Sequence, residues 1–181
     1  MRLFIAVASD EQVQKVAAAV IARLSRAKGN FRWVDPCDMH TTLRYLGPTP
    51  KDKIPGIRDL MTRAAREIPP FELVYGGVGA FNTLEEARVI WIGLSEGSEL
   101  MACLADLLGR DDPRPYAPHL TLGRNRKASA PDEFISALQT EPALNLRRPV
   151  KKISLYASRP TSFGHAYDIL YEVNLGAAVT V

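Results

Sequence analysis

The sequence is poor in cysteine and histidine, with two cysteines, Cys37 and Cys103, and three histidines among its 181 residues. Because the cysteines lie far apart and form no C-x-x-C pair, the sequence predicts neither a disulfide framework nor a thiolate metal site, and we expect both thiols to be reduced and packed. Long apolar runs are also missing: "LFIAVA" at residues 3–8 is too short for a signal peptide or a membrane span. We therefore expect a cytoplasmic protein that does not enter a membrane.

Charge of either sign is nearly balanced, with 23 Lys and Arg against 20 Asp and Glu and a formal net charge of +3. Apolar residues make up 46% of the chain, which is typical of a globular protein built as one compact unit or two small lobes. The cations gather in short groups at Arg124, Arg126 and Lys127, at Arg147 and Arg148, and at Lys151 and Lys152. These groups indicate either an anionic partner or a solvated surface.

Periodicity predicts a mixture of strands and helices. Strands are expected at residues 2–8, 31–34, 40–46, 71–75, 88–94, 119–123, 150–158 and 167–175. Four helices are expected: one from a capping box at Ser9 and Gln12 to Gly29, one over Ile57–Ala64 before Pro69, one with Leu100, Cys103, Leu104, Leu107 and Leu108 on its apolar stripe, and one over Pro131–Thr140. Loops are expected at the glycine-rich stretch 76–79 and around 163–165. Because no parallel βαβ rhythm is sustained, the order favours an α+β fold with antiparallel sheets.

One short phrase, His-x-Thr-Leu, occurs twice, at His40–Leu43 and at His119–Leu122. Residues i and i+2 of a strand share one face, so each histidine points with its threonine while the leucines Leu43, Leu120 and Leu122 point into the core. A pseudo-two-fold arrangement of two lobes would bring the two phrases together across a central cleft.

Two imidazoles and two threonine hydroxyls around one cavity suit a phosphate. One neutral histidine can take a proton from water while the other, protonated, donates to the leaving oxygen, and no metal is needed. Three other interpretations remain at this point. A single H-x-T is typical of an ordinary half-buried histidine, Cys37 and His40 have C-x-x-H spacing that suggests zinc, and His165 is an isolated loop residue that we expect on the surface.

Taken together, these segments resemble the two-histidine phosphoesterases, and within them the bacterial and archaeal RNA 2′,3′-cyclic phosphodiesterases, also called 2′-5′ RNA ligases. The resemblance spans nearly the whole chain, from "RLFIAV" through "RWVDPCDMHTTLRYLG", "GVGAF", "ARVIWIGL" and "APHLTLGR" to "ISLYASRPTSFGHAYDILYEVNL". It implies a bilobal α+β fold in which residues 1–181 form a single domain and each lobe supplies one H-x-T strand. It also implies metal-independent opening of a terminal 2′,3′-cyclic phosphate on RNA to a 2′-phosphate, with reversible 2′-5′ ligation in some members.

The resemblance assigns His40 as the acid that protonates the departing 3′-oxygen and His119 as the base that activates water, with Thr42 and Thr121 binding the phosphate. Arg124 matches an arginine that lies near the nucleotide, although strict alternation points it away from His119 unless Gly123 marks a bulge. Phe81 is a candidate for stacking on the terminal base. The first motif departs from the usual pattern in having Thr41 where an apolar residue is expected.

Two other functions use the same residues: a phosphodiesterase acting on a small cyclic nucleotide or an ADP-ribose cyclic phosphate, and a non-catalytic module that binds an RNA end or a nucleotide. For the enzyme we expect a monomer with no cofactor and no metal, and a bell-shaped pH–rate profile near neutrality.

Overall fold

The computed structural model describes residues 1–127, 129–161 and 164–176. Its helices are α1 (Glu11–Leu24), α2 (Ile54–Glu67), α3 (Ser98–Leu107) and α4 (Asp132–Gln139), with short 3-10 turns η1 (Pro36–Asp38) and η2 (Lys51–Lys53). Its strands are β1 (Arg2–Ala8), β2 (Phe31–Trp33), β3 (His40–Pro48), β4 (Phe71–Phe81), β5 (Val89–Glu96), β6 (His119–Asn125), β7 (Leu146–Val150), β8 (Lys152–Thr161) and β9 (Gly164–Asn174).

The strands form a continuous antiparallel sheet in the order β7-β4-β5-β6-β3-β1-β8-β9, with β2 paired to β6 beside β3. The expected α+β fold with antiparallel pairing is therefore confirmed. The sheet is joined in its middle, where β3 meets β6, by the single register pair Thr41 with Leu120. Both strands at this junction begin with a histidine.

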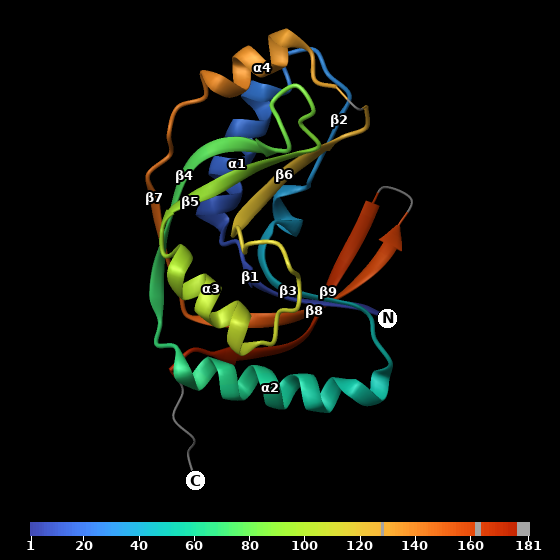
Figure 1. Cartoon of the computed structure of the whole chain (residues 1–181), viewed down its shortest axis with the longest axis vertical. Coiled ribbons are helices and arrows are strands. Elements are labelled where there is room, and N and C mark those ends of the chain that lie inside the picture. Colours follow the sequence, from blue (N-terminus) through green and yellow to red (C-terminus); the bar gives the residue numbers. More distant parts are fainter. Residues whose placement is uncertain (128, 162–163, 177–181) are drawn as a thin grey trace.

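The two large hydrophobic cores lie between the sheet and the helices, whose positions Figure 1 shows. One core packs α2 and α3 against β1, β3 and β8, and the other packs α1 and α4 against β4, β5 and β6. Leu43 of β3 is buried in the first core, whereas Leu120 and Leu122 of β6 are buried in the second. Each motif strand is thus anchored by its leucines in a different core, as the sequence predicted.

The first helix differs from its prediction at both ends. Its N-cap is Asp10 rather than Ser9, because the Asp10 carboxylate accepts hydrogen bonds from the backbone N–H groups of Gln12 and Val13. The helix ends at Leu24, well before Gly29. The backbone N–H groups of Ser25 and Arg26 already bond to carbonyls of the last turn, and this closes the helix without a glycine.

The stretch 76–79, expected to be a loop, belongs to β4. A Cβ atom on Gly79 would come within 2.5 Å of the Trp91 ring, and one on Gly93 within 2.9 Å, so these glycines leave room for an indole lying across the strands. The strand β7 was not predicted. It lies at the edge of the sheet, where Pro149 is tolerated because its missing N–H costs no ladder bond.

Side-chain burial differs from expectation on α3 and at both cysteines. The buried stripe of α3 consists of Met101, Leu104 and Ala105 and continues to Leu108 at the C-cap, while Leu100 and Leu107 are exposed. Cys37 and Cys103 are free thiols, but both are exposed, so the expectation that they are packed is wrong. Cys103 lies on the solvent side of α3 because the helix turns its methionine and alanine stripe to the core instead.

Candidate functional site

The four motif residues share one face of the sheet. Since Thr41 of β3 lies opposite Leu120 of β6, the antiparallel register places His40 opposite Thr121 and Thr42 opposite His119. Thr41 and Leu120 are fully buried on the other face, and all four motif residues are half-buried. The two histidines are diagonal neighbours, a relationship that separates residues by about 7–8 Å in a regular ladder. That gap can hold one phosphate.

Both imidazole rings are oriented by the same kind of contact. Nδ1 of His40 lies 2.8 Å from the carbonyl oxygen of Asp38, and Nδ1 of His119 lies 2.7 Å from that of Ala117, in each case two residues upstream. A carbonyl oxygen only accepts, so Nδ1 carries the proton in both rings and Nε2 is the group left to exchange a proton.

The two rings have different neighbours. His40 lies among the aromatic rings of Phe4 at 4.6 Å, Tyr167 at 5.2 Å and Tyr156 at 5.9 Å between centroids. Phe81 meets His119 edge to face at 4.7 Å. His40 is therefore enclosed by three aromatic rings, whereas His119 contacts the ring of Phe81 and is less enclosed.

Burial lowers the pKa of both histidines below the usual 6.5. The carbonyl hydrogen bonds oppose this effect, and neighbouring charge adds to it: His119 lowers the pKa of His40, and Arg124 lowers that of His119. Two cationic imidazoles at such close range repel each other. The free site therefore favours neutral rings at pH 7, and a bound anion would favour protonation of one of them.

Arg124 reaches the motif face through a bulge in β6. Trp91 of β5 lies opposite Thr121, but the next residue, Ile90, lies opposite Gly123, so Leu122 is the extra residue. The bulge shifts the alternation of β6 before Arg124, and the guanidinium lies close enough to His119 for its charge to lower that pKa. Across the other edge of β6, Arg32 of β2 lies opposite Arg124.

A cavity of about 810 Å³ opens beside the Thr42 and His119 edge of the motif face. Phe81 and Arg88 line it together with the segment 110–117, which approaches His119. The Tyr116 hydroxyl donates a hydrogen bond to the carbonyl oxygen of Thr42 at 2.9 Å, and this bond ties the segment to β3. A volume of this size is in the range of small-molecule sites.

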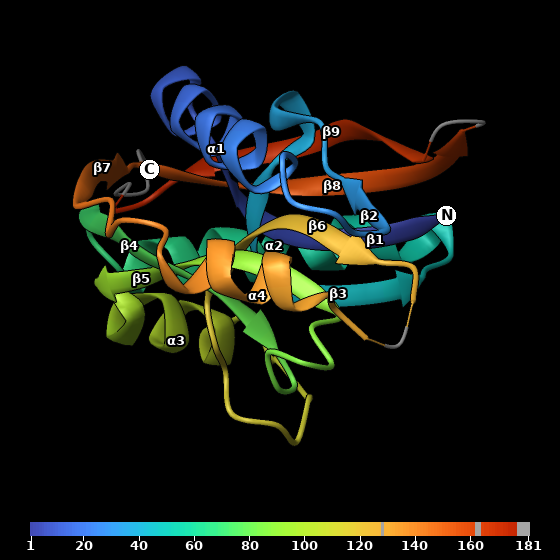
Figure 2. The same cartoon turned by 90° about the horizontal axis from the view of Figure 1, so that it is seen from above.

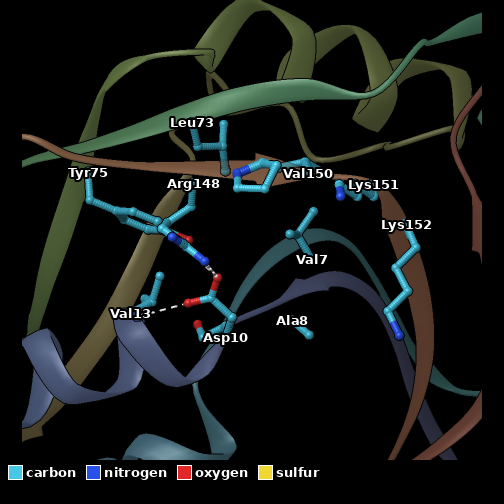
Figure 3. Close-up of a pocket in the computed structure, with 12 residues that line it drawn as sticks. Val7, Ala8, Asp10, Val13, Leu73, Tyr75, Arg148, Val150, Lys151 and Lys152 are labelled. Carbon is cyan, nitrogen blue, oxygen red and sulfur yellow. Dashed lines mark hydrogen bonds and ion pairs between the residues drawn. The ribbon is translucent and has the colours of Figure 1, made fainter.

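A second cavity, of about 320 Å³, has neither histidine in its lining (Figure 3). Figure 3 shows the Asp10 carboxylate between the backbone of Val13 and the guanidinium of Arg148, with Tyr75 on the wall. Asp10 and Arg148 form an ion pair, which ties the start of α1 to β7. These two residues therefore do not supply an acid–base pair.

The structure also bears on the interpretations of a metal site, a membrane span and the position of His165. Within the part of the chain that the structure describes, no three His, Cys, Asp or Glu side chains gather as metal ligands, and no helix has the length and apolar character to span a membrane. His165 is exposed, as expected, but it lies on β9, opposite Pro160 of β8, rather than in a loop. Phe163 of that expected loop lies outside the described residues.

Four aromatic residues of the site were not predicted: Phe4, Trp91, Tyr156 and Tyr167. Phe4 carried a usable signal, because alternation in β1 turns it away from the buried Leu3, Ile5 and Val7. Tyr156 and Tyr167 come from the β8–β9 pair, and nothing local in their segments points to a histidine more than a hundred residues away.

Comparisons with known proteins agree on one family. A model of the 2′-5′ RNA ligase superfamily matches residues 10–160. The RNA 2′,3′-cyclic phosphodiesterase of Thermotoga maritima is 30% identical over 95% of this chain and 94% of its own, and that of Thermus thermophilus is 32% identical over 97% and 90%. Among solved structures, E. coli LigT complexed with 3′-AMP superposes with a TM-score of 0.76 at 26% identity, over 96% of this chain and 97% of LigT.

Proposed function

The chain belongs to the 2′-5′ RNA ligase superfamily, and we propose that it hydrolyses the terminal 2′,3′-cyclic phosphate of RNA through the paired imidazoles of His40 and His119. It is an RNA 2′,3′-cyclic phosphodiesterase like its relatives, which match it over nearly their full length. The observation that carries the mechanism is the β3–β6 register, which brings both H-x-T motifs to one face.

The cyclic phosphate would lie between the two Nε2 atoms, with the hydroxyls of Thr42 and Thr121 donating to its nonbridging oxygens. Neutral His119 removes a proton from water, the water oxygen bonds to phosphorus, and the bond from phosphorus to O3′ breaks. Protonated His40 donates to O3′, which leaves a 2′-phosphate and a free 3′-hydroxyl. We keep His40 as acid and His119 as base, the roles that the family resemblance implies.

Two further side chains complete the proposed site. Arg124 would pair with the phosphate or the nucleotide, since the bulge brings its charge to the His119 side. Phe81 would stack on the terminal base, because it lines the large cavity next to His119. Neither role requires a metal or a cofactor.

We also propose that residues 1–181 form one bilobal domain that works as a monomer in the cytoplasm. The two cores, each holding one motif strand, support the bilobal interpretation, and the exposed free thiols of Cys37 and Cys103 suit a reducing compartment.

A small cyclic nucleotide is the second candidate substrate. The cavity of about 810 Å³ accommodates a nucleotide without further RNA, and LigT has been crystallised with 3′-AMP. A site that binds such an end without cleaving it is the third candidate.

The test is to incubate the protein in EDTA with an RNA oligonucleotide ending in a 2′,3′-cyclic phosphate and to identify the position of the product's phosphate. We expect a 2′-phosphate at an undiminished rate. A 3′-phosphate product, or activity that the chelator removes, would contradict the mechanism, and bound but uncleaved RNA would establish the non-catalytic alternative.

A further inference from the structure

Five cations form a surface that we call the basic strip: Lys28, Arg32, Arg124, Arg126 and Lys127. Its centre is the cross-strand pair of Arg32 on β2 and Arg124 on β6. Its outer end is held by a hydrogen bond of 2.8 Å from the backbone N–H of Arg126 to the carbonyl of Asn30. There Lys28 and Lys127 line a groove of about 440 Å³. All five side chains are exposed.

Several other cations on the described surface are neutralised by a carboxylate. Arg147 contacts Glu72 and Glu96, Arg159 contacts Asp168, and Arg23 contacts Glu141. In contrast, within residues 1–127, 129–161 and 164–176 no ion pair involves Lys28, Arg124, Arg126 or Lys127. The nearest carboxylates in sequence are Asp35, three residues after Arg32, and Asp132, which opens α4 beyond the groove.

The strip is continuous with the reaction site. Arg124 follows the β6 bulge and lies opposite Arg32. Burial and the Asp38 carboxylate raise the pKa of Tyr167 overall, while both guanidiniums lower it, and the Tyr167 ring meets His40. The strip therefore begins at Arg124, near the histidine pair, and continues past the end of β6 to Arg126 and Lys127.

The cavity on the opposite edge is a poorer path for a polyanion. Its Arg114 is bound to Asp112 at 2.6 Å, and its Arg110 donates to the carbonyls of Asp112 and Arg114. Asp111 also lines it. The cavity thus suits one nucleoside, whereas Lys28, Arg124, Arg126 and Lys127 of the strip are exposed and have no ion pair among the described residues.

We propose that the RNA chain on the 5′ side of the cyclic phosphate lies along the basic strip, which contacts its backbone phosphates without reading its sequence. This proposal rests on the proposed function and adds the path of the substrate to it. The enzyme is then selective for polynucleotide ends over mononucleotides, because only a longer chain reaches Lys28, Arg126 and Lys127.

The test compares two substrates, a 2′,3′-cyclic mononucleotide and a ten-residue RNA with the same terminal nucleotide. The triple variant Lys28→Ala, Arg126→Ala, Lys127→Ala removes the outer strip and leaves Arg32 and Arg124 in place. A matched control, Lys51→Ala, Lys53→Ala, Arg63→Ala, changes the net charge equally at η2 and α2, at the other end of the molecule (Figure 1).

We expect kcat/KM for the ten-residue RNA to fall about tenfold or more in the strip variant, with mononucleotide hydrolysis changed less than about twofold and the control like wild type. The plot of log kcat/KM against log salt should also become shallower by about 2, since each lost contact to a single strand contributes about 0.7. An equal loss of kcat/KM in the control variant, or an equal loss for both substrates, would contradict the proposed RNA path along the strip. Absence of hydrolysis of either substrate by the wild type would instead refute the proposed function.

Discussion

At the scale of single residues, the site is defined by how each imidazole is held. Both Nδ1 atoms are committed to carbonyls two residues upstream, so only the Nε2 atoms are free for chemistry. The motif histidines are therefore equivalent in their backbone contact and unequal in their surroundings, with aromatic rings around His40 and the charge of Arg124 near His119.

The lowered pKa values of His40 and His119 predict where activity is highest. A profile of kcat/KM reports the free enzyme, and one of kcat reports the complex. Because burial lowers both pKa values below 6.5, we expect the kcat/KM optimum on the acid side of pH 6.5. The bound phosphate anion favours the charged imidazole, so the kcat optimum should lie at higher pH. Coincident optima above pH 7 would show that burial does not control these groups.

Replacing Arg124 should alter two quantities at once. Its charge lowers the pKa of His119, so in Arg124→Gln the acid limb of kcat/KM should move to higher pH while KM rises. The loss of a charge-assisted contact predicts a KM increase of roughly 10-fold to 100-fold. Arg63→Gln on α2 serves as the control. A higher KM with an unmoved acid limb would place the guanidinium near the nucleotide but not near His119.

At the scale of secondary-structure elements, α1 depends on its cap. Asp10 accepts from two backbone N–H groups and pairs with Arg148, so Asp10→Ala should destabilise the protein by about 1 kcal/mol and lower Tm by roughly 2–4 °C. The matched control is Glu11→Ala, which removes only an exposed i,i+4 ion pair with Lys15. This change should lower the free energy of unfolding by only a few tenths of a kcal/mol.

The same carboxylate predicts how stability changes with pH. Although burial alone would raise the pKa of Asp10, the contacts of Val13 and Arg148 lower it overall below 3.8. Asp10 thus stabilises the fold above its unfolded pKa, and this contribution is lost as the pH falls through the folded value. The Tm difference between wild type and Asp10→Ala should therefore shrink below about pH 4, whereas a constant difference would assign the effect to packing.

Elements whose pattern is local were predictable, and those set by distant partners were not. The strands β3 and β6 follow from alternation, although each runs two residues beyond its predicted end, and the duplicated motif indicated that they meet. In α3, two apolar stripes compete, and only the position of β1 and β3 decides that Met101 and Ala105 face inward rather than Leu100 and Leu107. Likewise, Gly79 is a strand residue because Trp91 lies across it, which no window of sequence around residue 79 reveals.

At the scale of the whole molecule, β3 of one core pairs with β6 of the other, and β4 contributes side chains to both cores. A single bilobal domain predicts one cooperative thermal transition. Leu43→Ala and Leu120→Ala, one in each core, should each cost about 2–5 kcal/mol and shift that same transition. Two transitions, each shifted by only one of the variants, would mean that the cores unfold independently.

The central claim is that two histidines 79 residues apart act as one acid–base pair on one phosphate, and a double-mutant cycle tests it most directly. Hydrolysis of a cyclic-ended RNA is measured for wild type, His40→Ala, His119→Ala and the double variant, with circular dichroism to verify folding. Each single change should lower kcat by about 10²–10⁴, and the double variant should be scarcely slower than either, because both groups serve one step. Near-normal activity in either folded single variant, or a double effect equal to the product of the two, would contradict the account.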